Sequence, residues 1–163
     1  MGMRYTITKA DRLVRSLSGR PRHRLEEICE GIQQAEETLV AHAQPHFEAC
    51  MRHCNGLCCR NIYVDQIITP LDIVYIRVLA PDRIGPLMVR AEKQGLFSAD
   101  CIFLENGVGP CSFGMNLKPE RCIITFCSDT DAIRQEIRAV QRGFGKLQRF
   151  LMLHCPVRWF FYL

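Results

Sequence analysis

The feature that most constrains this chain is a dense cluster of cysteines in its central part. Four thiols occur within ten residues, at Cys50, Cys54, Cys58 and Cys59. Four more follow further along the chain, at Cys101, Cys111, Cys122 and Cys127. Isolated core cysteines do not cluster in this way, whereas zinc and iron–sulfur sites need several thiolates around one point. We therefore predict that these eight thiols form one metal site or two adjacent ones.

The adjacent pair Cys58-Cys59 bears on how many metal ions are held. Side chains of neighbouring residues diverge, so both sulfurs are awkward ligands for one small ion. They serve more easily as ligands of two metals, or of two irons of one cluster. In a third arrangement one binds the metal and the other is a hydrogen-bonding neighbour. The sequence leaves these alternatives open.

A histidine precedes the cluster at the same spacing. His46, Cys50 and Cys54 are four residues apart, and such positions share one face of a helix. Pro45 suits the first turn of that helix, and Asn55-Gly56 signals its end. His46 is either a further ligand or an ordinary, partly exposed helix residue.

The expected compartment favours metal over disulfides. No apolar segment of the secretory type follows the first residues, and no run of about 18 apolar residues could span a membrane. We therefore expect a cytoplasmic protein without a membrane contact. In a reducing cytosol, disulfides explain ten cysteines poorly. The expected cofactor is an iron–sulfur cluster, in the 4Fe-4S form, and otherwise zinc.

The remaining sequence predicts a mainly α fold, with helices packed around the cysteine site and a small irregular or β-hairpin segment that carries cysteines. At 163 residues, a single domain is expected over 1–163, with the metal-binding core at about 46–127. Basic residues, broken by Gly19 and Pro21, predict a partly ordered N-terminal arm over about 1–21. Apolar positions at helical spacing predict helices over 22–43 and about 130–154.

Shorter elements are expected between the two long helices. Residues 62–68, rich in β-branched side chains, predict a strand, and Thr69-Pro70 predicts a capped helix that runs to about Leu79. A further helix is expected over 86–94. On the helix over 22–43, the glutamates are assigned to the solvent-facing side, as follows: Glu26, Glu27, Glu30, Glu36 and Glu37.

The second group of cysteines lies in a segment with turn signals. Asn106-Gly107 is a pair that tight hairpins prefer, so Cys101 and Cys111 are expected to face each other across a small hairpin. Pro119 then suits the first position of a helical turn that carries Cys122.

These motifs, in this order, resemble the YkgJ-type cysteine-cluster family, which is described as zinc- or iron-chelating (CxxCxxCC). The resemblance covers about residues 50–127 and rests on the following stretches: Cys50, Cys54 and Cys58-Cys59-Arg60; Thr69-Pro-Leu-Asp72-Ile73; Cys101-Ile-Phe-Leu104; Glu105-Asn-Gly107; Cys111-Ser-Phe; and Lys118-Pro119-Glu-Arg-Cys122. The chain departs from the family pattern at three points. Three residues separate Cys54 from Cys58 where the family often has two. Lys118 stands before the proline where the family usually has arginine, and Ile123 follows Cys122 where arginine is common.

The resemblance implies metal binding and says little about activity. Members similar to flagellin lysine-N-methylases are linked to an iron–sulfur centre and protein methylation, so a redox or protein-modification role is one expectation. No glycine-rich loop that follows a strand, of the kind that binds nucleotides, is present. Near the cysteines, three cations could donate hydrogen bonds to the sulfurs or hold an anionic substrate: Arg60, Lys118 and Arg121.

Two further functions remain as alternatives. A metal with an open coordination position would make the chain a small metalloenzyme. A closed zinc site would make it a structural module that docks an acidic protein or nucleic acid through its basic faces. The net charge of +4 does not by itself argue for nucleic acid. The apolar end, Trp159 to Leu163, is expected to pack on the body or to form a contact between identical subunits.

Overall fold

The fold is mainly α, as the sequence predicts. The computed structural model describes residues 2–49, 64–92, 101, 103, 104, 111, 113 and 117–155. Within these ranges the regular elements are helices, and β-pairing is limited to one isolated bridge. In chain order the helices are α1 (Met3–Ser16), α2 (Gly19–His42), α3 (Gln44–Ala49), α4 (Val64–Ile67), α5 (Pro70–Leu79), the 3-10 turn η3 (Pro81–Arg83), α6 (Ile84–Glu92), α7 (Glu120–Ile124), the 3-10 turn η5 (Asp131–Ile133) and α8 (Arg134–His154).

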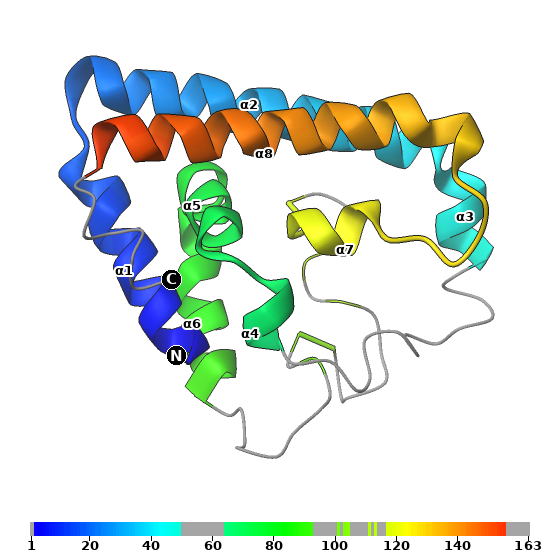
Figure 1. Ribbon diagram of the computed structural model, residues 1–163. Helices are drawn as coiled ribbons and strands as arrows, with labels where there is room; N and C mark the ends of the chain where they lie inside the picture. The colour runs from blue at the N-terminus through cyan, green and yellow to red at the C-terminus, as the bar shows by residue number, and fades with distance from the viewer. Residues whose placement is uncertain are drawn as a thin grey trace.

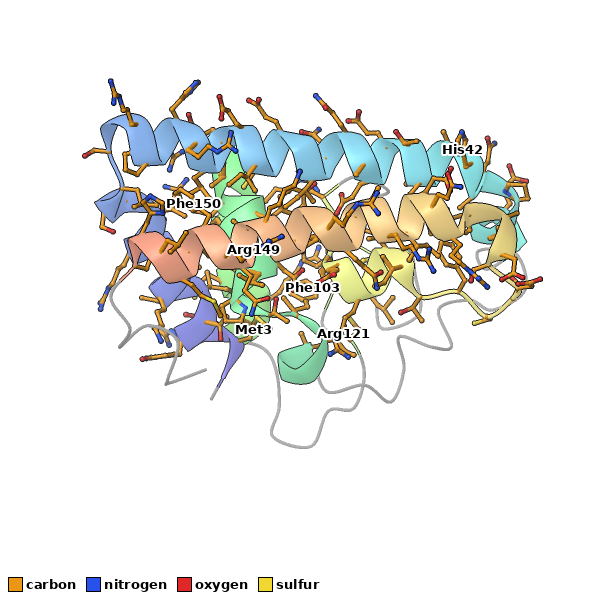
Figure 2. All side chains as sticks on the ribbon, turned by 45° about the horizontal axis from the view of Figure 1, so that its top comes forward. Met3, His42, Phe103, Arg121, Arg149 and Phe150 are labelled. Carbon is orange, nitrogen blue, oxygen red and sulfur yellow. The ribbon has the colours of Figure 1, made fainter. Side chains whose placement is uncertain are left out.

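The two long helices, α2 and α8, lie side by side and run in opposite directions (Figure 1). Both were expected from their apolar periodicity, and the apolar stripes face each other in the core. The helices approach most closely at Gly143, where a Cβ atom would lie 2.8 Å from Ile32 Cγ1. At the far end of the pair, His42 Nδ1 lies 2.7 Å from Glu136 Oε1 (Figure 2 labels His42).

The first helix, α1, corrects the prediction of a partly ordered basic arm. Its apolar residues recur at helical spacing and are buried against α5 and α6, as follows: Met3, Ile7, Ala10, Leu13 and Val14. The basic residues lie between them and obscured that stripe. On the buried side, Asp11 pairs with Arg15 at 2.9 Å and also binds Arg77 of α5. Gly19, at φ 58°, allows the sharp turn that sends the chain from α1 into α2.

Helix α5 begins as the sequence predicts. Thr69 and Asp72 form a capping box, and Pro70 occupies the first helical turn. The helix packs beneath the α2–α8 pair, where the Tyr75 ring meets the Phe144 ring edge-on at 5.5 Å between centroids. Tyr75 and Phe144 are fully or almost fully buried, so this contact lies in the centre of the core.

The strand expected over 62–68 is wrong where the structure describes it. Val64 to Ile67 form the single helical turn α4, and Ile68 N donates to Val64 O at 2.8 Å. Val64 and Ile68 are both buried, and positions four apart share one side of a helical turn. Burial on one side therefore outweighs the β-branched composition. Helix α6 begins at Ile84, two residues before the predicted start, because η3 leads directly into it.

No helix in the described part of the chain has both the length and the apolar character needed to cross a membrane.

Candidate metal centre

The structure describes four of the eight predicted ligands. Cys101 is buried, Cys111 and Cys122 are half-buried, and Cys127 is exposed. None of the four forms a disulfide with another described cysteine. The other four predicted ligands, and Arg60, lie outside the described residues: Cys50, Cys54, Cys58 and Cys59. Among the residues that are described, no three His, Cys, Asp or Glu side chains are grouped as metal ligands would be.

The segments of Cys101 and Cys111 come together, but the residue opposite Cys111 is Leu104 and not Cys101. Leu104 and Cys111 form an isolated antiparallel bridge, which brings the two chain segments together; the Asn106-Gly107 turn lies outside the described residues. Burial raises the pKa of the Cys101 thiol, and the backbone N–H groups of Phe103 and Leu104 act against this rise. Hydrogen bonds from backbone N–H groups to a sulfur favour the thiolate, which is the form that binds metals.

Two arginines bind the backbone near Cys101 and Cys111. Arg83 Nη1 donates to the carbonyl of Phe113 at 3.1 Å, and Arg90 Nη1 donates to the carbonyl of Phe103 at 3.5 Å. The rings of Phe103 and Phe113 are buried and lie 4.6 Å apart between centroids. Cys101 and Cys111 are therefore carried by a segment whose two arms are fixed by side chains from η3 and α6.

Helix α7, which carries Cys122, is held by two buried carboxylates. Glu36 Oε2 accepts a hydrogen bond from Leu117 N at 3.1 Å, and Asp72 Oδ1 accepts one from Glu120 N at 2.7 Å. Burial raises the pKa of Glu36 to about 8, although donors from Tyr75 and Leu117 oppose the rise. Burial also raises the pKa of Asp72, against the hydrogen bonds from Thr69 and Glu120.

Glu36 is a residue that sequence reasoning placed wrongly. The sequence pattern predicts that Glu36 lies on the solvent-facing side of its helix, yet the residue is 1% exposed. The signal was in the spacing, because Glu36 lies four residues after Ile32 and three before Leu39, in line with the buried stripe. A glutamate inside an apolar stripe indicates a buried acceptor and not a solvated charge.

Helix α3 docks on the segment that contains Cys127. His46 Nδ1 lies 2.7 Å from Ser128 Oγ, and its ring meets Phe126 edge-on. Phe47 also contacts Phe126, with 5.2 Å between ring centroids. These contacts favour the interpretation of His46 as a docking residue of the helix. They bring the end of α3, one residue before Cys50, to the segment of Cys127.

The two cations expected beside the sulfurs have different surroundings. Lys118 Nζ lies 5.6 Å from the centre of the Phe47 ring, which is a cation–π contact. Arg121 is exposed, and Figure 2 shows its side chain on the side of α7 away from α8.

Two further cysteines stand apart from the cluster in sequence. Cys29 on α2 and Cys155 at the end of α8 are both buried in the core. Burial raises the pKa of Cys29 to about 12 and also raises that of Cys155. Their burial and raised pKa values are those of structural core thiols.

No protein-family model matches this chain. The search of curated proteins gave no match, and the search of solved structures gave none either.

Proposed function

We propose that this chain is a metal-binding protein of the YkgJ type, in which clustered cysteine thiolates hold an iron–sulfur cluster of the 4Fe-4S form, or zinc. The proposed ligands come from two groups: Cys50, Cys54, Cys58 and Cys59, and Cys101, Cys111, Cys122 and Cys127. The family assignment rests on the ordered sequence motifs. A bound cluster would supply redox chemistry, and bound zinc would supply a closed structural site or a Lewis acid.

One structural observation supports this most strongly. Helix α3 and helix α7, which carries Cys122, lie on the same side of the α2–α8 pair (Figure 1). The bridge joins the Cys101 and Cys111 segments, and the His46–Ser128 contact joins α3 to the Cys127 segment. The end of α3, which leads into the first group of cysteines, thus lies against the segment of Cys127 from the second group, and a thiolate site needs segments that approach in this way.

The donor chemistry of the described thiols fits such a site. Cys101 has backbone N–H groups directed at its sulfur, which is the outer-shell arrangement that stabilises metal-bound thiolates. Cys111 lies close enough to Cys101 to raise its pKa, so two thiols already share one region. A nearby cation would relieve the repulsion between the two thiolates.

The test is the metal and acid-labile sulfide content of protein purified without oxygen, with its visible spectrum. Brown protein with iron and sulfide in comparable amounts would support the cluster. Colourless protein with one or two zinc ions per chain would support the zinc form. Protein with less than about a tenth of an equivalent of either metal, which also fails to take up added iron or zinc, would contradict the proposal.

A second candidate, a structural zinc module that docks an acidic protein, is favoured by one surface. The exposed residues Arg138, Arg142 and Lys146 lie along α8, and within the described part of the chain none of them forms an ion pair. Arg134, at the start of the same stripe, pairs with Asp131. This candidate predicts colourless protein whose binding to an acidic partner weakens with added salt.

A further inference from the structure

Glu36 and Asp72 are the buried charged residues in the described part of the chain, with 1% and 0% exposure. They come from different helices, α2 and α5, that belong to the core. Buried carboxyl groups are costly unless hydrogen bonds satisfy them, and apolar side chains of similar size could fill the same space. We therefore ask which groups these two carboxylates bind.

Both carboxylates bind the backbone of one short segment. Glu36 receives the N–H of Leu117, and Asp72 receives the N–H of Glu120. The core supplies further donors: Tyr75 OH donates to Glu36 Oε2 at 3.0 Å, and the Thr69 backbone and hydroxyl donate to Asp72 Oδ2. Glu36 Oε1 is buried without a hydrogen-bond partner among the described residues. The two bonds fix the segment at both of its ends.

The fixed segment leads directly into Cys122. Cys122 N donates to the carbonyl of Pro119 at 2.9 Å, so the cysteine belongs to the first turn that follows the segment. Leu117 has φ 62°, a left-handed conformation that a leucine rarely adopts. Such a conformation persists where its surroundings impose it, and here Glu36 holds the N–H of that residue.

We propose that Glu36 and Asp72 are positioning residues of the metal centre, which hold the turn from Leu117 to Glu120 so that Cys122 is presented to the metal. This inference rests on the proposed function. Side chains that orient metal ligands without touching the metal typically alter affinity by about 10- to 100-fold when removed. The same two residues also stabilise the core, so the test must separate the two roles.

The chain contains a matched control for Asp72. Thr69 shares the capping box with Asp72, but only Asp72 binds Glu120 of α7. Thr69→Ala therefore removes a cap of α5 and leaves the tie to α7. Asp72→Ala removes the other half of the capping box, the bonds from Thr69 N and Oγ1, together with the tie to α7. A role confined to the α5 cap would make the two variants behave alike.

The experiment uses the full chain, stripped of metal and titrated with Co²⁺ without oxygen. The thiolate-to-cobalt absorption reports how many sulfurs bind. We expect Asp72→Ala to bind Co²⁺ about 10- to 100-fold more weakly. At saturation its absorption should be reduced to that of Cys122→Ser. Thr69→Ala should melt at a lower temperature but give the wild-type spectrum and affinity.

Glu36 supplies a second pair of variants in case Asp72→Ala does not fold. Glu36→Leu places an apolar side chain in the buried stripe and removes the hydrogen-bond acceptor. This variant should therefore lose cobalt absorption as Cys122→Ser does. Glu36→Gln keeps an acceptor oxygen for Leu117 N and should give the wild-type spectrum.

Each outcome decides the question. Wild-type spectra and affinities in folded Glu36→Leu, or in Asp72→Ala, would overturn the positioning role while leaving the proposed function intact. Equal spectral loss in Thr69→Ala and Asp72→Ala would assign Asp72 to the helix cap alone and overturn its positioning role. A wild-type chain that binds Co²⁺ without thiolate absorption would overturn the proposed function, and this inference with it.

Discussion

Two regions of this molecule share one apolar core but differ in their polar contacts. The helical frame, made of α1, α2, α5 and α8, is joined by apolar side chains that recur at helical spacing and are buried against one another. The cysteine-bearing segments, which are the described residues between 101 and 127, also bury apolar side chains in this core, such as Phe103 and Ile123. In addition they are tied to the helices through their backbone. Their carbonyls and N–H groups bind charged side chains, as follows: Arg83, Arg90, Glu36 and Asp72.

The difference indicates what each region needs in order to fold. Apolar burial is sufficient for the frame, because each helix covers the apolar stripe of another. The cysteine-bearing segments contain one short helix and one isolated bridge as regular structure. They therefore depend on side-chain anchors and, in our proposal, on a metal. The predictions below test this division, in order of decreasing effect.

Metal removal should have the largest effect, and only on the cysteine-bearing segments. Structural zinc contributes roughly 10–16 kcal/mol in zinc-finger peptides, which exceeds or equals the roughly 5–15 kcal/mol that stabilises a typical domain. After chelation, we expect amide hydrogen exchange to accelerate strongly at Leu104 and Ile123 and to change little in α2 and α8. Exchange mass spectrometry measures this directly. Equal acceleration of exchange in both regions would contradict the claim that the metal stabilises only the cysteine-bearing segments.

Phe144→Ala should destabilise the frame with or without metal. The side chain is 2% exposed and its ring meets Tyr75 in the core, so its removal leaves a cavity. Such changes cost about 3–5 kcal/mol of unfolding free energy, measurable by urea denaturation. Leu153→Ala is the control on the same helix, because Leu153 is 81% exposed and should change stability by less than about 0.5 kcal/mol. A Phe144→Ala loss seen only in metal-loaded protein would contradict the division.

The ionisation of Glu36 should make stability fall as the pH rises. Burial raises its pKa in the folded chain from 4.5 to about 8, so the folded state binds the proton more tightly than the unfolded chain does. Its contribution is complete below about pH 4.5 and decreases by up to about 1.4 kcal/mol per pH unit until about pH 8. We expect the stability difference between wild type and Glu36→Gln to follow this slope between pH 5 and pH 8.

The difference between the two proteins removes the titration of the cysteines and other groups that they share. A difference that is constant over this pH range would show that Glu36 is ionised in the folded protein, contrary to the account.

The close approach of α2 and α8 should be sensitive to a single methyl group. Gly143→Ala places a Cβ 2.8 Å from Ile32 Cγ1 and should cost about 1–3 kcal/mol of unfolding free energy. Gly145→Ala is the matched control two residues later, where nothing lies within 4 Å, and it should be neutral or stabilise by up to about 1 kcal/mol. Thermal melts of both variants test this pair, and similar values for the two would argue against the observed packing.

The smallest effect should come from Asp11, which ties α1 to α5. Burial raises the pKa of Asp11, but hydrogen bonds from Arg77 and Arg15 outweigh this effect and lower the pKa below its ordinary value. A lowered pKa stabilises the fold above the unfolded value of about 4 and loses that effect as the pH falls further. Because these side chains are partly exposed, Asp11→Asn should cost only about 0.5–1 kcal/mol at pH 7. The loss should vanish near pH 3, and a loss that persists there would exclude the ion pair as its cause.

Local signals explain which elements could be predicted from the sequence. The capped start of α5 was predicted correctly because Thr69, Pro70 and Asp72 act within one helical turn. Helices α2 and α8 were predicted because long apolar periodicity overrides local detail. The turn residues Asn106-Gly107 predicted that the segments of Cys101 and Cys111 approach each other, and the observed bridge joins Leu104 to Cys111.

The errors have one cause, which is that a tertiary partner decides the outcome. The apolar stripe of α1 is interspersed with basic residues in the sequence, and it becomes buried only because α5 and α6 pack against it. Residues 64–67 form a helical turn because Val64 and Ile68 are buried on the same side, although their composition favours a strand. Glu36 is buried because Leu117, 81 residues further on, supplies a donor that no local pattern shows.

The most direct test of the central claim compares two buried cysteines that differ only in their assigned role. Cys101→Ser and Cys29→Ser both alter a buried thiol, but only Cys101 belongs to the proposed metal centre. We predict that protein purified without oxygen contains clearly less metal per chain in Cys101→Ser than in wild type, and the same amount in Cys29→Ser. Equal metal content in all three proteins would contradict the claim that the clustered cysteines hold a metal.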